Sequence, residues 1–369
     1  MCKKGLTVMN KGANVLTRPD QTRPDQNYAL NYGVALLKIW MSFQVVLAHF
    51  WHAEDVKLLH LKPFATLGGL PVTVFMFIAF IFSEKFIVER NSQKLHSRLF
   101  RLIVVHVSWT LIYFVFYLAG AVFAGKGTFA GQNAKSIAVS FLAQLFLGST
   151  INPPMWFHID LIILTLAFWL IFYKFPEKTA FILLSCCVIF AVAAKYTGLN
   201  FLAFGNIPYA FNKYTLGRLC EMIPVAGSGL IFARFNLMEK LSRHRTAAMI
   251  VSVVLGIAVY AAKFPVPAQG FMYQKIYVDI AAILMTIFFW LLPFDNISST
   301  VKRLIAGISR LTLGVYCMHM LVGTCIMIAA GYQKATFSFV ECLMIYAVCL
   351  AVGFILSLIL GKNRNYLIG

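Results

Sequence analysis

A lysine and a histidine in one apolar stretch, residues 31–52, are the residues of this sequence best placed to do chemistry. Lys38 and His49 are eleven positions apart, just over three turns of an α-helix, so both side chains would lie on one face about 16 Å apart along the axis. Ionisable residues inside a membrane are costly and usually face a bundle interior or a wet cavity, which makes this face a candidate site. The alternative is that Lys38 extends to a lipid headgroup and His49 lies at the far interface.

A second candidate is the basic run 85–101, which should face the cytoplasm. Arg98 and Arg101 are three positions apart where a helix is expected to begin, so both guanidinium groups point from one face, and Lys94 precedes them by one turn. Such a pair can bind phosphate groups in bidentate fashion. The alternative is ordinary positive charge that sets the topology.

Polar residues in later apolar segments form weaker candidates. Trp156, His158 and Asp160 lie in the first turns of one segment; Asp160 is costly enough in a membrane to need a partner, whereas His158 suits a structural contact. Arg218 and Glu221 are spaced so that they can neutralise each other. Trp156, Asp160 and His319 are the candidate substrate-binding residues. A single polar residue such as His319 or Asp279 can also serve packing alone.

The chemistry that these residues suit is proton abstraction. A histidine inside the membrane can take a proton from a hydroxyl group, while basic residues at the cytosolic mouth hold an anionic donor. The sequence has no nucleotide-hydrolysing loop, no serine nucleophile elbow and no metal-ligand spacing, and we expect no metal.

Composition assigns these residues to a polytopic membrane protein. Hydrophobic residues make up 60% of the 369 residues, charged residues 12%, and the mean hydropathy is +0.79. The net charge of +19 lies mostly beside apolar segments, so it indicates anionic lipid and anionic cytosolic ligands rather than nucleic acid. The eight cysteines show no C-x-x-C spacing and are expected to be reduced packing residues.

We predict an all-α bundle of about ten transmembrane helices with both termini in the cytoplasm. The transmembrane domain covers residues 29–361, after a disordered cytosolic tail at 1–28 with a tandem Thr-Arg-Pro-Asp-Gln repeat and before a short cytosolic tail at 362–369. The spans are expected at about 31–52, 67–86, 102–123, 155–172, 179–194, 216–232, 247–262, 276–292, 311–330 and 337–360.

The stretch 137–147 decides between ten crossings and eleven. It is short for a crossing, and we interpret it as interfacial or re-entrant. With ten crossings, 22 of the 32 Lys and Arg residues lie inside and 10 outside. An eleventh crossing would move the basic cluster 234–245 outside, so ten crossings are favoured.

The order of these motifs resembles the membrane acyltransferase 3 family across most of residues 30–360. Lys38 and His49 match the family's basic residue and histidine eleven positions later, and Arg98-x-x-Arg101 matches its paired arginines. The runs 74–77, 155–157 and 315–319 resemble its aromatic second helix, its Leu-Trp-Phe motif and its Ile-Tyr-Leu-x-His motif. The chain departs from the family at Ala79-Phe80, where a Ser-Gly pair is usual, and around Val104, where a proline is common.

The resemblance implies transfer of an acyl group, commonly acetyl, from cytosolic acyl-coenzyme A to a hydroxyl of a surface polysaccharide or its lipid-linked precursor, in a bacterial cytoplasmic membrane. It implies that His49 is a general base or acyl relay and that Lys38 lines the donor path. It also implies that Arg98 and Arg101 bind the phosphates of coenzyme A, and acetyl-coenzyme A is the expected donor.

Two other classes remain open. A transporter or flippase of lipid-linked glycans would also have many helices, buried polar residues and a basic cytosolic face, but often shows internal repeats, which this sequence lacks. A glycan polymerase or ligase would be expected to have a large external loop, and no external loop exceeds about thirty residues in the predicted topology.

Overall fold

The computed structural model describes residues 31–51, 70–124, 129–148, 150–197, 217–262, 271–329, 331, 337–361, 363 and 367. The predicted tail at 1–28, His52 and most of 362–369 lie outside these residues, so the predictions for them stay untested.

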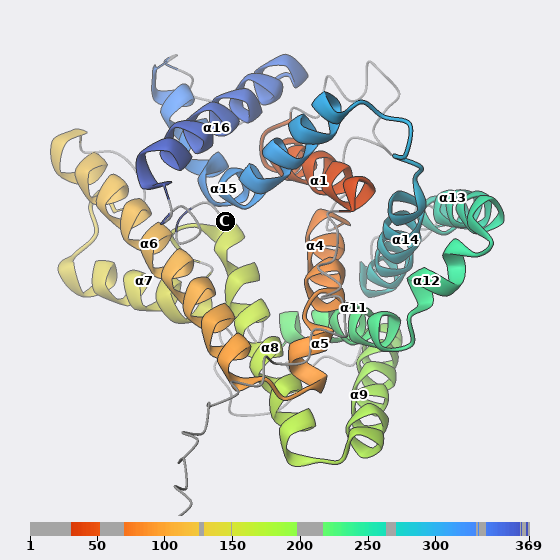
Figure 1. Cartoon of the computed structure of the whole chain (residues 1–369). Coiled ribbons are helices and arrows are strands. Elements are labelled where there is room, and N and C mark those ends of the chain that lie inside the picture. Colours follow the sequence, from red (N-terminus) through yellow and green to blue (C-terminus); the bar gives the residue numbers. More distant parts are fainter. Residues whose placement is uncertain are drawn as a thin grey trace, which may run out of the picture.

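The described residues form an all-α structure, which confirms the predicted fold class (Figure 1). Each predicted span coincides with a helix: α1 (Tyr32–Phe50), α4 (Leu70–Ile81), α6 (Ser92–Ala124), α8 (Trp156–Lys174), α9 (Glu177–Thr197), α11 (Gly217–Arg234), α13 (Arg245–Ala262), α14 (Phe271–Leu291), α15 (Ser299–Ala329) and α16 (Phe339–Leu360). Six of them, α1, α6, α8, α9, α15 and α16, are long and apolar enough to cross a membrane. The chain is therefore a multi-pass membrane protein.

The outer faces of the helices are apolar, as a lipid environment requires. Ile189 on α9, Ile257 on α13 and Ile359 on α16 are 67%, 63% and 74% exposed. Exposed apolar side chains on several helices would form aggregation-prone patches in water, whereas lipid tails accommodate them.

Helix ends differ from the prediction where polar side chains cap helices outside the apolar spans. α6 begins at Ser92, ten residues before the predicted span, because Asn91 Oδ1 accepts the backbone N–H of Lys94 at 2.9 Å. α15 similarly begins at Ser299, after Ser298, whose Oγ accepts the N–H of Val301. Arg98, Arg101 and Arg310 thus lie on the helices themselves rather than at their starts.

The second span is also shorter at its carboxyl end than predicted. α4 ends at Ile81, and the predicted residues after it form a turn and the short helix α5 (Glu84–Val88). Short α12 (Leu237–Ser242) similarly follows α11.

The uncertain stretch 137–147 belongs to helix α7 (Ala134–Leu147). Asn133 caps its beginning by accepting the N–H of Ser136, and Gly148 ends it in the left-handed region at φ 66°. Its 14 residues span about 21 Å, less than the roughly 30 Å of a bilayer core. The interfacial or re-entrant placement of α7 remains a prediction, because α4, which is counted among the spans, has only 12 described residues.

Helix α4 lies at the centre of the bundle and supplies much of its core (Figure 1). It packs against α1, α8, α11 and α14. Val74, Met76, Phe77 and Phe80 are fully buried. Because α4 is apolar on every side, it must be surrounded by protein or lipid, and the neighbouring helices take their places around it.

Helix α1 packs between α14, α15 and α16, and its beginning is fixed to α14. Asn31 caps α1 by accepting the N–H of Val34, and its Nδ2 donates to the carbonyl of Trp290 at 3.0 Å. Gly33 follows, and a Cβ there would collide with the carbonyl of Phe289, so only glycine allows the two backbones to approach this closely.

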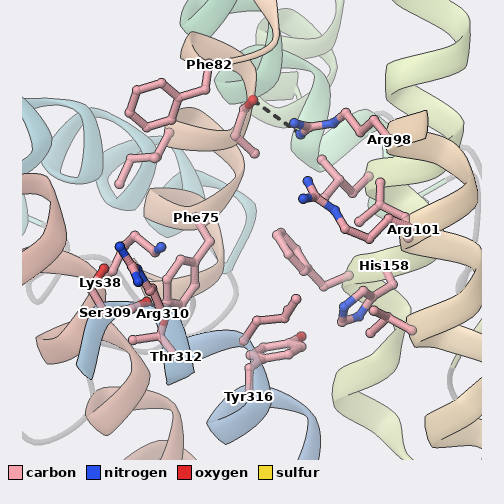
Figure 2. A pocket seen from close by; sticks show the side chains of 17 residues that line it. Lys38, Phe75, Phe82, Arg98, Arg101, His158, Ser309, Arg310, Thr312 and Tyr316 are labelled. Atoms are coloured by element: carbon pink, nitrogen blue, oxygen red, sulfur yellow. Dashed lines mark hydrogen bonds between the residues drawn. The ribbon is translucent and has the colours of Figure 1, made fainter. Parts of the chain in front are cut away.

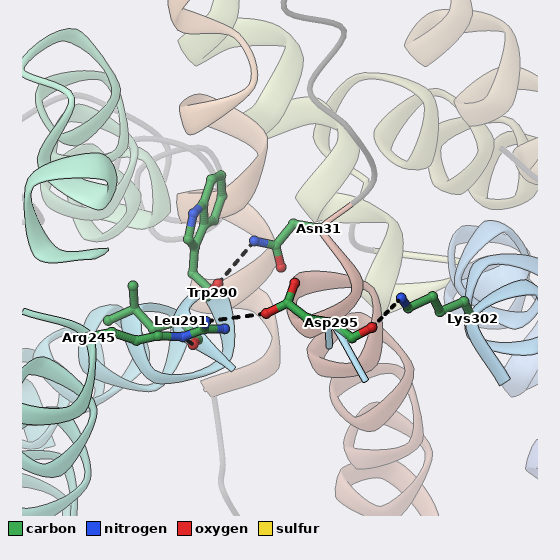
Figure 3. A network of polar contacts seen from close by, with 6 residues as sticks. All are labelled: Asn31, Arg245, Trp290, Leu291, Asp295 and Lys302. Atoms are coloured by element: carbon green, nitrogen blue, oxygen red, sulfur yellow. Dashed lines mark hydrogen bonds and ion pairs between the residues drawn. The ribbon is translucent and has the colours of Figure 1, made fainter. Parts of the chain in front are cut away.

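The loop between α14 and α15 joins the same region to α13 and α15 (Figure 3). Arg245 at the start of α13 pairs with Asp295 at 3.7 Å and donates to the carbonyl of Leu291. Lys302 on α15 donates to the backbone carbonyl of Asp295 at 3.2 Å. These contacts hold the starts of α1, α13 and α15 to the end of α14.

Close packing of α11 on α4 yields a stability prediction. A Cβ at Gly229 of α11 would lie 2.7 Å from the carbonyl oxygen of Phe77 and 3.3 Å from the backbone nitrogen of Ile81, neither of which can rotate away. We expect Gly229→Ala to lower the stability of the folded protein by about 1–3 kcal/mol through overpacking. Thermal unfolding of the detergent-solubilised protein measures this as a lower Tm.

The matched control is Gly307→Ala on α15, where a Cβ would meet no described atom within 4 Å. Alanine favours a helix over glycine by about 1 kcal/mol, so this variant should keep or raise the Tm. Equal Tm values for Gly229→Ala and the parent would contradict the close approach of α11 and α4.

Candidate functional site

One cavity of about 360 Å³ lies among α1, α4, α6, α8 and α15 (Figure 2). Three sequence candidates from two distant helices line it: Lys38 of α1 and the pair Arg98 and Arg101 of α6. Its volume falls within the roughly 300–1,000 Å³ of small-molecule sites. The structure therefore brings together cations that the sequence places sixty residues apart.

A fourth cation, Arg310 of α15, lies beside Lys38 on the wall opposite Arg98 and Arg101 (Figure 2). No aspartate or glutamate lines the cavity, and within the described part of the chain none of the four cations forms an ion pair. Lys38 and Arg98 are half-buried, so water screens them less than a surface charge. The cavity is thus a candidate anion site, with four positive charges that have no carboxylate partner among the described residues.

Arg98 is held in place by its own contacts. Its guanidinium lies 5.6 Å from the ring centroid of Phe86, and Nη2 donates to the carbonyl of Ala79 at 3.4 Å. Arg101, one turn further along α6, is exposed on the same cavity. The first arginine is therefore oriented in advance, and the second is free to adjust to a ligand.

His158 and Tyr316 also line the cavity, with His158 next to Arg101 in Figure 2, and their rings are 5.8 Å apart. Both side chains are buried, and Phe75 of α4 packs on Tyr316 at 6.5 Å. The Tyr316 hydroxyl donates to the carbonyl of Pro154, which fixes the ring. Tyr316 also lies 6.2 Å from the ring of His319, so it separates the cavity from a second group of residues.

That second group is a pair of histidines, His49 at the last turn of α1 and His319 of α15. Their ring centroids are 5.1 Å apart. His319 is fully buried, whereas the side chain of His49 is exposed. His49 does not line the cavity of the four cations; it lies beyond Tyr316 and His319.

The candidates Trp156 and Asp160 lie together at the start of α8, outside the cavity. Asp160 is fully buried and pairs with Arg218 of α11 at 3.5 Å, and the Arg218 guanidinium lies 5.1 Å from the ring of Trp156. Arg218 also donates to the carbonyl of Leu147 at 2.9 Å. The buried carboxylate of Asp160 therefore has the basic partner that a charge in a membrane segment needs, and this partner comes from another helix.

Lys94 is a sequence candidate that the structure does not bring to the cavity. It is exposed near the start of α6, one turn before Arg98, and it is not among the lining residues.

Three residues line the cavity although the sequence did not predict them as site residues: Arg310, His158 and Tyr316. The predicted topology places Arg310 in a cytosolic loop, because the ninth span is expected to begin at residue 311. The sequence carried no signal for Arg310, because its spacing of six residues from Tyr316 does not place the two on one face of α15. His158 was expected to make a structural contact; it lines the cavity, with Nε2 4.0 Å from the sulfur of Cys317.

A family model described as an acyltransferase domain matches residues 31–362, nearly the whole chain. No curated protein and no solved structure matches it. The match covers every helix of the bundle and every residue of the cavity and of the histidine pair. The chain belongs to the acyltransferase 3 family and is a membrane acyltransferase.

Proposed function

We propose that the protein transfers an acyl group, acetyl in the first instance, from cytosolic acyl-coenzyme A to a hydroxyl group of a surface polysaccharide or its lipid-linked precursor. The observation that carries this proposal is the cavity with four cations and no carboxylate among its described lining residues, next to a histidine pair on two apolar helices. The family supports acyl transfer in general. The donor, the acetyl group and the glycan acceptor are proposed from the resemblance to this family, and the cations and the histidine pair suit an anionic donor and proton abstraction.

The donor would bind in the cavity through its phosphates. Coenzyme A carries a pyrophosphate and a ribose phosphate, and Arg98 and Arg101 present guanidinium groups that suit such oxygens. Arg310 and Lys38 face them from the other wall, so phosphates between the walls would be neutralised from both sides. Lys94 is too far out along α6 to join them and would act only on the approaching donor.

The acyl end of the donor would reach His49 past Tyr316. Lys38 and His49 lie on the same helix about 16 Å apart along its axis. The long pantetheine arm of coenzyme A would span this distance, with the phosphates bound at the Lys38 end. In the predicted topology the cations lie toward the cytoplasm and His49 toward the outside, with both termini cytoplasmic in the cytoplasmic membrane. The donor would enter from the cytosol, and the acceptor would meet it at His49.

In the transfer step His49 would act as general base. Its free ring nitrogen takes the proton of the acceptor hydroxyl while the hydroxyl oxygen forms a bond to the thioester carbonyl carbon. The carbon–sulfur bond then breaks, and the imidazolium returns the proton to the sulfur. The products are an ester on the acceptor and free coenzyme A, with no change of oxidation state.

Trp156 and Asp160 are proposed to serve the acceptor side. Asp160 is fully buried against Arg218, so its part would be to hold Arg218 and the Trp156 ring in place rather than to contact a sugar. Trp156 is only partly buried and offers an aromatic face. His319, the third sequence candidate, is fully buried and lies against His49.

The general-base role predicts the effect of His49→Ala. We expect kcat for acyl transfer to fall by about 10²–10⁴-fold, because the hydroxyl loses its proton acceptor, with the protein still inserted and folded. The measurement is transfer of labelled acetyl from acetyl-coenzyme A to glycan, in membranes that also express the glycan pathway, at matched protein levels. His96→Ala is the matched control, because His96 is exposed on α6 and stacks only on Phe100.

Normal labelling by a well-expressed His49→Ala variant would remove His49 from the mechanism. Absence of label with the parent itself, despite an active glycan pathway, would instead favour transport of lipid-linked glycans by this bundle.

The donor site predicts the effect of removing its cations. Arg98→Ala, Arg101→Ala and Arg310→Ala should each raise KM for acetyl-coenzyme A roughly 10- to 100-fold, since each loses charge-assisted hydrogen bonds worth about 1.5–3 kcal/mol. The measurement is the initial rate of transfer against donor concentration. Arg303→Ala is the matched control, because Arg303 is exposed on α15 and does not line the cavity.

Unchanged KM in all three variants would return these arginines to a topological role. A raised KM for Arg98→Ala and Arg101→Ala with none for Arg310→Ala would confine the phosphates to the α6 wall.

A further inference from the structure

The ring of His319 is fixed in one tautomer by the helix that carries it. Nδ1 lies 2.8 Å from the carbonyl oxygen of Tyr316 and 3.2 Å from that of Val315. Carbonyl oxygens only accept hydrogen bonds, so Nδ1 must carry the proton. The neutral ring therefore has its lone pair on Nε2.

This Nε2 atom is a buried acceptor without a partner. His319 is 0% exposed, and within the described part of the chain Nε2 has no hydrogen bond. A buried acceptor left unpaired costs about 1–3 kcal/mol, and such an atom in a folded protein calls for an explanation. A hydrogen-bond donor that arrives during the reaction cycle would supply one.

His49 is the polar side chain next to it. The two rings are 5.1 Å apart at their centroids and inclined by 39°. The His49 side chain is exposed, and a ring separation of 5.1 Å is short enough for a rotation about its own bonds to turn a ring nitrogen toward Nε2. Catalytic hydrogen bonds are often long before the substrate binds and shorten in the reacting complex.

The backbone around His49 holds the two helices at this separation. Phe50 packs into α15 at Gly323, where a Cβ would collide with its ring, and it lies 6.3 Å from His319. The Phe50 carbonyl accepts the N–H of Phe337 at 2.6 Å, which ties the end of α1 to the segment before α16. His49 is thus an exposed side chain on a backbone that its neighbours hold in place.

We propose that His319 is a positioning residue for His49. Its Nε2 accepts the ring N–H of His49, which leaves the other His49 nitrogen with its lone pair toward the acceptor hydroxyl. Once His49 has taken the proton, the same bond holds the imidazolium in place until the proton passes to the thiolate. This inference rests on the proposed acyl transfer and adds the residue that selects the active tautomer of its base.

The test is a pair of substitutions that separate hydrogen bonding from packing. His319→Gln places an amide oxygen near the position of Nε2 and can still accept from His49, whereas His319→Leu fills similar space and cannot. We expect kcat for acetyl transfer from acetyl-coenzyme A to fall about 10- to 100-fold in His319→Leu, with KM for the donor within twofold of the parent. His319→Gln should recover most of that loss.

A second measurement does not depend on activity. In protein labelled with ¹⁵N in the histidine rings, NMR distinguishes the two neutral tautomers, and the difference from His49→Ala assigns the signals of His49. We expect His319→Leu to change the tautomer ratio of His49 and His319→Gln to preserve it. His96→Ala should leave the His49 signals unchanged, because His96 lies at the start of α6.

An equal loss of kcat in His319→Gln and His319→Leu would overturn the positioning role, and so would a rise in KM without a fall in kcat. A His49 tautomer ratio that neither substitution changes would also overturn it. These outcomes differ from failure of the proposed function. In that case His49→Ala itself would retain transfer, or the parent would transfer no label, whatever residue stands at 319.

Discussion

The cost of placing positive charge inside an apolar bundle governs the arrangement of this protein. Lys38 and Arg98 are half-buried, and neither is paired with a carboxylate among the described residues. In a membrane interior such charges persist only beside water or an anion. The cavity supplies that place, and Asp160, the buried carboxylate near the start of α8, is instead neutralised by Arg218. The paired charges of Asp160 and Arg218 thus join two helices of the scaffold, whereas the cations without a carboxylate partner among the described residues mark the candidate site.

Two helices, α1 and α15, each carry one residue of the cation cavity and one residue of the histidine pair, and so fix the distance between these two groups. α1 contributes Lys38 to the cavity and His49 to the histidine pair, and α15 contributes Arg310 and His319. The helices pack directly on one another. A displacement of either helix would therefore move the proposed donor site and the proposed base together, which keeps the distance between them constant.

The elements of the fold could be predicted because each is specified by its own apolar stretch. Lys38, Arg98 and Arg101 could be predicted to face the bundle interior, because charged side chains in membrane segments are costly elsewhere. A shared cavity for the three is what the resemblance to the family implied. Contacts between helices could not be predicted. The charge of Glu221, one turn away, acts on Arg218 as expected, but the ion pair of Arg218 with Asp160 of α8 at 3.5 Å could not be foreseen. His319 looked like a solitary polar residue because its neighbour, His49, is 270 positions earlier in the chain.

The same pairings bear on the number of membrane crossings. Lys38 lies beside Arg310 (Figure 2). His49, later in α1, lies beside His319, later in α15, so the two helices run in the same direction. Two parallel spans must be separated by an odd number of crossings. The ten-helix topology places seven between them, α4, α6, α8, α9, α11, α13 and α14. If α7 also crossed, there would be eight, and α15 would oppose α1. The contacts that assemble the site therefore favour ten crossings independently of the distribution of positive charge.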